Sequence, residues 1–221
     1  MSNYIKHPKT LHLPWSRSID ESDKVLEFTE CFHGKEVIVT AKLDGENTTM
    51  TRDHIHARSL DSRDHISRHW VKNLHSTIKG EIPEEWRIVG ENMYAEHSIH
   101  YNNLKSYFYA FFIWDENNMC LSWNNFIDWC KLLNIDTVPV LYDGIWDEEK
   151  IKGLYTPTFD GCDLEGYVVR IKDVFHFDDF HKSTGKFVRK NHVCKKHFWR
   201  ERIVPNELGI INKGEKNGSS Y

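Results

Sequence analysis

Residues 36–47, which read EVIVTAKLDGEN, constrain the fold of this chain more than any other stretch. Residues 37–39 are all β-branched, and such side chains crowd a helical turn but pack well on a pleated sheet. Asp44 and Gly45 then supply turn chemistry. We therefore expect a buried strand that ends near Lys42, then a turn, and then a segment at residues 48–51 that pairs back against the strand.

Lys42 is an unusual residue to find at the end of a buried strand. Removal of an ammonium group from water disfavours its charged form, so the pKa of this lysine is expected to fall towards that of a nucleophilic neutral amine. The position of Lys42 therefore indicates a chemical role.

The composition limits the class of protein. The chain has 221 residues, of which 39% are hydrophobic, and this is enough for one substantial core. No run of about 18 apolar residues occurs, and the N-terminus lacks the apolar segment of a signal peptide, so we expect no membrane association. The five cysteines are odd in number and include no Cys-x-x-Cys pair, which favours the reducing cytoplasm over a disulfide framework.

The net charge of −4 does not indicate a nucleic-acid binder, but one segment does. Residues 186–202 hold seven Lys or Arg and one Glu, interleaved with three aromatic residues. Basic side chains can hold phosphates and aromatic rings can stack on bases. The segment is either a nucleic-acid contact or a solvated basic face.

The pattern of helices and strands is mixed without regular alternation, which favours an α+β fold. Apolar spacing predicts helices over residues 64–78 and 123–133, the second behind a Ser122 cap, and shorter helices over 20–28, 147–152 and 197–205. Further strands are predicted at residues 55–58, 86–91, 106–114, 164–171 and 186–189. No repeat or long linker divides the chain, so residues 1–221 are expected to form one domain.

Chemically distinctive residues recur near the predicted strands, in a definite order along the chain. They are Arg58, Glu91, Phe111, Glu165, Lys186 and Lys190. With Lys42 they make a nucleophilic amine, two carboxylates, an aromatic platform and a cationic cluster. Transfer of a nucleotidyl group needs each of these groups, because positioning and charge neutralisation dominate such chemistry.

The tetrapeptide Lys42-Leu43-Asp44-Gly45 matches the Lys-x-Asp-Gly signature of the covalent nucleotidyltransferases. Together with the ordered motifs, over roughly residues 35–192, the chain resembles the RNA ligase branch of that superfamily. The resemblance implies a nucleotidyltransferase domain, an ATP-grasp-like ligase domain with antiparallel sheets flanked by helices. Its catalytic motifs would lie within residues 42–190, with a short C-terminal extension at residues 191–221.

The resemblance also implies a role for each residue. Lys42 would attack the α-phosphate of ATP and form a lysyl-AMP adduct, with Asp44 and Gly45 among the nucleotide-binding residues. Arg58 would contact the ribose or a phosphate, and Glu91 would bind the ribose hydroxyls.

The later motifs complete the implied site. Phe111, in preference to Phe112, would stack on the adenine. Glu165 would help to hold a divalent metal, Mg²⁺ or Mn²⁺, and to organise the lysine. Lys186 and Lys190 would neutralise the α-phosphate.

The chain departs from the family pattern at two places. Lys186 and Lys190 flank Val188 where the family has Lys-x-Lys, so the phosphate contact could come from Lys186, Arg189 or Lys190. Ala41 stands where many relatives carry a carboxylate before the nucleophile. The contribution of that carboxylate to adenine binding must therefore come from elsewhere in this chain or be absent.

The leading expectation is an ATP-dependent RNA ligase that joins 5′-phosphate and 3′-hydroxyl RNA ends in RNA repair, through lysyl-AMP and a 5′-adenylylated RNA. The 31 residues after Lys190 are too few for a C-terminal OB barrel, so a partner protein or end-healing enzyme could supply part of the substrate grip. The alternatives are a ligase for DNA or hybrid nicks and a non-catalytic binder of nucleotides or RNA ends. The choice between a nick, a single strand and a tRNA break stays open, as does the oligomeric state.

Overall fold

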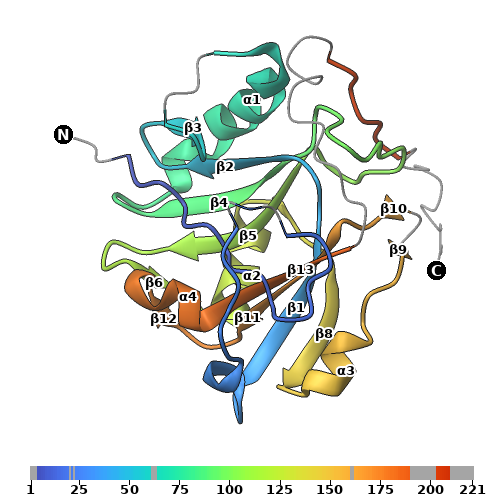
Figure 1. Cartoon of the computed structure of the whole chain (residues 1–221). Helices are drawn as coiled ribbons and strands as arrows, with labels where there is room; N and C mark the ends of the chain where they lie inside the picture. The colour runs from blue at the N-terminus through green and yellow to red at the C-terminus, as the bar shows by residue number, and fades with distance from the viewer. Residues whose placement is uncertain are drawn as a thin grey trace, which may run out of the picture.

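Two largely antiparallel sheets form the centre of the structure, a computed structural model that describes residues 4–19, 21, 23–60, 64–159, 162–189 and 203–209 (Figure 1). The first sheet has the strand order β13-β11-β1-β8. Its strands are β1 (Glu36–Lys42), β8 (Val140–Ile145), β11 (Gly166–Ile171) and β13 (Thr184–Val188).

The second sheet has the order β12-β6-β5-β4-β2-β3, with β7 parallel to β5. Its strands are β2 (Glu46–Met50), β3 (Ile55–Ala57), β4 (Arg87–Asn92), β5 (Phe108–Trp114), β6 (Met119–Cys120), β7 (Asp136–Thr137) and β12 (Phe175–His176). A separate short pair joins β9 (Thr158–Phe159) to β10 (Cys162–Asp163).

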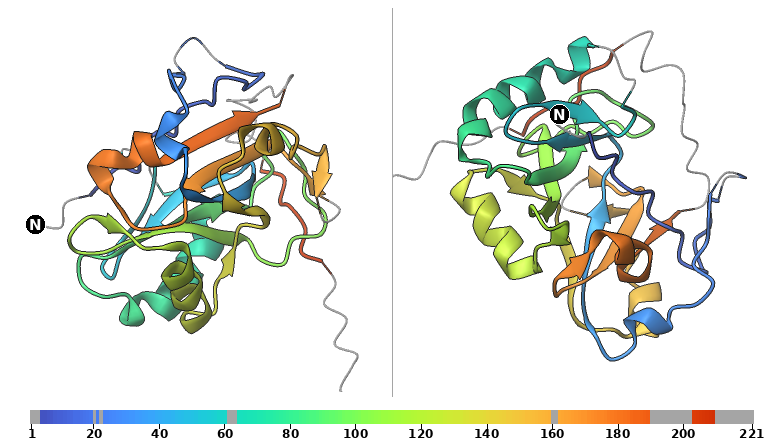
Figure 2. Two further views of the ribbon diagram at one scale, coloured as in Figure 1. Left: turned by 90° about the horizontal axis from the view of Figure 1, so that it is seen from below. Right: turned by 90° about the vertical axis from the view of Figure 1, so that its left-hand side faces the viewer.

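The helices are α1 (His69–Ile78), α2 (Trp123–Leu132), α3 (Glu148–Lys152) and α4 (Phe180–Ser183), with 3₁₀ turns η1 (Glu30–Phe32), η2 (Ile66–Arg68), η3 (Lys79–Glu81) and η4 (Phe177–Asp179). Helices α1 and α2 lie on the side of the molecule away from β11 and β13 (Figure 2). The α+β expectation is confirmed in this mixture of helices and antiparallel sheets.

The pairing predicted for the segment after Lys42 is wrong. β1 does end at Lys42, but it pairs with β8 and β11, whereas β2 pairs with β3 and β4 in the other sheet. The Asp44–Gly45 step is therefore a crossing between sheets. Glycine is required there, because a Cβ on Gly45 would lie 2.5 Å from the carbonyl oxygen of Asn92.

Helix predictions succeed where a cap marks the start. Ser122 accepts a hydrogen bond from the Asn125 N–H at the start of α2, and Asp147 accepts one from Lys150 at the start of α3. The helix predicted from residue 64 begins as η2 and becomes α1 only at His69. The helix predicted over residues 20–28 is absent from described residues 23–28, and that predicted over 197–205 lies mostly outside the described residues.

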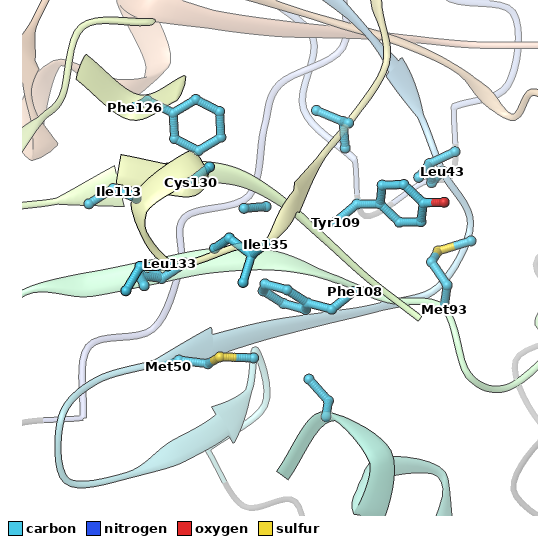
Figure 3. Packing of buried hydrophobic residues seen from close by; sticks show 14 of the residues in the cluster. Leu43, Met50, Met93, Phe108, Tyr109, Ile113, Phe126, Cys130, Leu133 and Ile135 are labelled. Carbon is cyan, nitrogen blue, oxygen red and sulfur yellow. The ribbon is translucent and has the colours of Figure 1, made fainter. Parts of the chain in front are cut away.

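Two apolar clusters hold the layers together. One joins α1 and α2 to the second sheet, and Figure 3 shows Phe126 and Cys130 of α2 near Ile113 of β5. The other lies between the sheets, where Val37 and Val39 of β1 meet aromatic residues of β5 such as Phe112 and Trp114. Across the described part of the chain, every helix is too short or too polar to span a bilayer.

Residues 11–17 run along the free edge of β13. Leu13 donates to the Lys186 carbonyl (2.7 Å), Lys186 donates to the Leu11 carbonyl (2.9 Å), and Arg17 donates to the Val188 carbonyl (2.9 Å). The N-terminal segment thus covers the strand that carries Lys186.

Candidate active site

A cavity of about 370 Å³ opens at the end of β1. Its walls come from both sheets and from the N-terminal residues 7–10. Six of the residues predicted from the sequence line it: Lys42, Gly45, Arg58, Glu91, Phe111 and Lys186. Glu165 is joined to this group by its ion pair with Lys42. The fold therefore gathers side chains that are up to 144 positions apart in the sequence, the span from Lys42 to Lys186.

Lys42 forms an ion pair with Glu165 through its Nζ and the Oε2 of the carboxylate. The pairing follows from register, because Lys42 lies opposite Gly166, and Glu165 immediately precedes β11. A Cβ on Gly166 would lie 1.9 Å from the carbonyl oxygen of Phe187 in β13, so only glycine lets the strands approach this closely. This approach brings β13, which carries Lys186, close to the end of β11 that follows Glu165.

The pKa of Lys42 lies above its ordinary value, contrary to the expectation from burial alone. Burial is the largest influence and lowers the pKa, but the negative charges of Glu165, Glu91 and Asp44 together outweigh it. In the protein alone, Lys42 is therefore an ammonium held by carboxylates. It must lose a proton before it can act as a nucleophile.

Glu91 is the second carboxylate of the site. It lies in β4 opposite Asn47 and accepts a hydrogen bond from the Gly45 N–H (3.2 Å). Burial is the main cause that raises the pKa of Glu91 to about 8, a net value in which Lys42 opposes the rise and the charges of Glu165 and Asp44 add to it. This carboxyl group can therefore hold a proton near neutral pH.

Asp44, the aspartate of the signature, forms hydrogen bonds with other residues of the protein. Its buried carboxylate accepts hydrogen bonds from the Ser98 N–H (2.8 Å) and the Ile99 N–H (3.2 Å), and its own N–H donates to the Tyr101 hydroxyl. Asp44 thus holds the loop after β4 beside the lysine. Asp44 contributes to the site through its position and charge, whereas Lys42, Leu43 and Gly45 of the signature line the cavity.

Arg58 and Asn47 bring polar groups to the cavity. The Arg58 N–H donates to the Asn47 carbonyl (3.0 Å), which ties the residue after β3 to β2. The buried Arg58 Nε and Asn47 Oδ1 have no hydrogen-bond partner among the described residues. Buried polar atoms are normally paired, so these two are suited to a polar ligand.

Phe111 reaches the cavity through a β-bulge. Val89 of β4 faces Phe112 and the next residue, Gly90, faces Ala110, so Phe111 is an extra residue in β5. A bulge re-aims side chains and breaks the alternation of a regular strand. Phe111 and Phe112 therefore both line the cavity, their rings perpendicular and 5.5 Å apart.

Lys186 is the second cation of the site. It faces Val168, which faces Thr40 of β1, so Lys186 shares a sheet face with Lys42, two residues further along β1. Burial and the charge of Lys42 lower the pKa of Lys186 to about 8.

The other two candidate cations are less well defined. Arg189 donates its N–H to the Glu165 carbonyl (3.0 Å) and is not among the described residues that line the cavity. Lys190 lies outside the described residues, so its predicted phosphate contact stays a prediction.

Sequence reasoning missed several cavity residues. Arg68 of η2 makes a two-pronged ion pair with Glu46 of β2, with N–O distances of 2.5 and 2.6 Å. His7 and His97 also line the cavity, and burial lowers the pKa of both. These residues lie in loops or short turns with no periodic pattern, so no local sequence signal distinguishes them.

The described residues include no group of three or more His, Cys, Asp or Glu side chains that could hold a metal ion. Mg²⁺ and similar ions are commonly held by one or two carboxylates together with substrate phosphates. Glu165 and Glu91 fit that arrangement, since both lie close enough to Lys42 to influence its pKa. They do not form a metal site whose ligands all come from the protein.

The fold and the site define a nucleotidyltransferase-type domain. The family model described as RNA ligase matches residues 35–190, which is more than half of the chain. The chain therefore belongs to the RNA ligase family.

Solved structures of an RNA ligase from Naegleria gruberi resemble this chain. An apo mutant is 22% identical with a TM-score of 0.56, and the match covers 76% of this chain and 53% of that one. A mutant with ATP and Mn is 22% identical with a TM-score of 0.57, covering 83% and 59%. A mutant with AMP and Mn is 23% identical with a TM-score of 0.55, covering 76% and 54%.

This chain spans a little more than half the length of those ligases, and at this identity the likeness shows the fold. No curated protein sequence matches the chain.

Proposed function

We propose that this protein is an ATP-dependent RNA ligase that joins 5′-phosphate and 3′-hydroxyl ends through a lysyl-AMP intermediate. The observation that carries the proposal is the Lys42–Glu165 ion pair in a cavity that also presents Phe111 and Lys186. Family membership and the ATP and AMP in the Naegleria gruberi structures support it. Residues 1–221 would act as one adenylyltransferase domain, with residues 191–221 as its extension.

The first step transfers AMP to the protein. Lys42 passes a proton to a neighbouring acceptor, for which Glu165 is in direct contact, and its Nζ then attacks the α-phosphorus of ATP. The N–P bond forms as the bond to pyrophosphate breaks, and pyrophosphate leaves. Lys186, on the same sheet face, neutralises charge on the transferred phosphate, with Lys190 as the second cation.

The other residues hold the nucleotide. Phe111 stacks on the adenine, Glu91 binds the ribose hydroxyls, and the unpaired Arg58 Nε contacts the ribose or a phosphate. Glu165, together with the nucleotide's phosphates, would hold Mg²⁺ or Mn²⁺, which supplies further neutralisation of phosphate charge.

Two further steps complete ligation. A 5′-phosphate oxygen of RNA attacks the adenylate phosphorus, the N–P bond breaks, and 5′-adenylylated RNA forms. The 3′-hydroxyl of a second end then attacks the RNA 5′-phosphorus and AMP leaves. This role belongs to RNA repair in the cytoplasm, after an end-healing enzyme has prepared the ends.

Mass spectrometry of the full chain after incubation with ATP and Mg²⁺ tests the first step. We expect a gain of one AMP, about 329 Da from the stoichiometry of the adduct, on the peptide that contains Lys42. Lys42→Ala should abolish the gain. Lys35→Ala, at an exposed lysine just before the same strand, is the matched control and should keep it. An unchanged mass with ATP, NAD and GTP would overturn the proposal.

Strand exchange tests the later steps. The isolated adduct should lose AMP to 5′-phosphorylated RNA, and addition of a 3′-hydroxyl end should give a joined product. Transfer to 5′-phosphorylated DNA in preference to RNA would instead identify a DNA ligase.

A further inference from the structure

His7 lies in an aromatic corner of the cavity. Its side chain is 6% exposed, and its ring centroid lies 5.8 Å from that of Phe111 and 5.4 Å from that of Phe112. Phe180 of α4 meets the same ring edge-on at 5.3 Å. The imidazole thus borders the two phenylalanines that line the cavity.

The segment that carries His7 is anchored just after His7 in the chain. Lys9 forms an ion pair with Asp23, and the backbone from residue 11 onward runs along β13. The position of His7 is therefore set by contacts outside the aromatic corner.

The imidazole of His7 has an unmet hydrogen-bonding capacity. Its Nδ1 is buried without a partner, and neither ring nitrogen bonds to another described residue. The other buried histidines among the described residues each bond through at least one ring nitrogen: His12 bonds to Ser16 and Asp23, His75 to the Thr51 carbonyl, and His56 to the Ala57 carbonyl, although the Nε2 of His56 is also buried without a partner. A buried polar group without a hydrogen-bond partner destabilises the fold, so an imidazole among phenylalanines is a poor choice for packing alone.

The ring is neutral across the physiological pH range. Burial, together with the positive charges of Arg58 and Arg87, lowers the pKa of His7 to about 3. A neutral imidazole always offers one acceptor nitrogen and one donor N–H.

We propose that His7 is a specificity-determining residue that selects 6-aminopurine nucleotides by accepting a hydrogen bond from the 6-amino group of a base stacked on Phe111. This inference rests on the proposed function, because that function places the base beside Phe111. His7 completes the hydrophobic stacking site with a polar contact that stacking cannot provide, since every base has a π-face.

Calorimetric titration of the full chain with AMP and with purine riboside 5′-monophosphate, which lacks the 6-amino group, isolates this contact. Neither monophosphate can form the lysine adduct by loss of pyrophosphate. A net hydrogen bond of about 0.5–1.5 kcal/mol corresponds to a preference for AMP of about two- to tenfold. We expect that preference in the parent and a Kd ratio near one in His7→Phe, which keeps an aromatic ring in the corner.

Two further variants complete the design. His7→Asn retains an acceptor and should keep part of the preference, whereas His33→Phe, at an exposed histidine, should behave as the parent does. Circular dichroism and thermal melting report whether each variant is folded.

The proposal is overturned if the parent binds the two nucleotides equally or binds neither, whatever the variants do. It is also overturned if folded His7→Phe keeps the preference. These outcomes are separable from failure of the proposed function: an adduct at Lys42 with an unchanged Kd ratio removes only the role of His7. A parent that selects AMP and never forms an adduct removes only the ligase chemistry.

Discussion

The Glu91→Gln variant should gain stability relative to the parent, and this gain should be larger at pH 8 than at pH 6. The pKa of Glu91 is raised from 4.5 to about 8 in the folded state. Between those values the native state keeps a proton that the unfolded state has lost, so the stability of the parent falls as pH rises through this window. Glutamine resembles the protonated acid at every pH and still offers an acceptor to the Gly45 N–H.

The size of the effect follows from the width of the window. Each pH unit in which the two states differ by one proton is worth about 1.4 kcal/mol. Between pH 6 and pH 8 the full effect would be close to twice that, reduced at the upper end as native Glu91 begins to ionise, which leaves about 2 kcal/mol. For a domain of this size that difference corresponds to a shift of roughly 4–8 °C in Tm.

Thermal melts of both proteins at pH 6 and pH 8, in the same ionic strength, measure this difference. Glu84→Gln removes a carboxylate whose side chain is 85% exposed and serves as the control, with a small effect expected at both pH values. A gain for Glu91→Gln that is equal at the two pH values would refute the reasoning. A loss at pH 8 would do so more directly, because it would mean that Lys42 stabilises Glu91 as an ion.

Two other predictions concern the signature and the second cation. Asp44→Ala should destabilise the fold by about 2–4 kcal/mol, because it leaves the Ser98 and Ile99 N–H groups without this acceptor. Asp44→Asn keeps an acceptor oxygen and should cost clearly less, as measured by urea denaturation. Equal costs for the two variants would contradict this reasoning. The Lys186 amine, with a pKa of about 8, loses charge as pH rises, whereas arginine does not. The adenylylation rate of the parent relative to Lys186→Arg should therefore fall several-fold between pH 7 and pH 9, and a flat ratio would count against a charged Lys186 in the step.

Local chemistry made several parts of the structure predictable. The β-branched run predicted β1, and the apolar spacing behind the Ser122 cap predicted α2, because the forces involved act between residues close in sequence. The resemblance to the RNA ligase branch implied that Glu165 and Lys186 would join Lys42, and the structure brings the three residues together.

Other features depend on where distant segments lie. The bulge at Phe111 arises from register with β4, so strand alternation could not show that Phe111 and Phe112 line the same cavity. The pairing of β2 depends on β4, which lies nearly 40 residues further along the chain. No local pattern could have placed His7 beside these rings.

The sequence by itself therefore determined the reactive groups and the strand that presents Lys42, since these depend on residue identity and short-range periodicity. Only the tertiary structure decided the charge state of those groups and their neighbours. Burial alone would lower the pKa of Lys42, yet carboxylates from three separate segments raise it. Electrostatic energy depends on distance through space, and the folded backbone alone sets that distance.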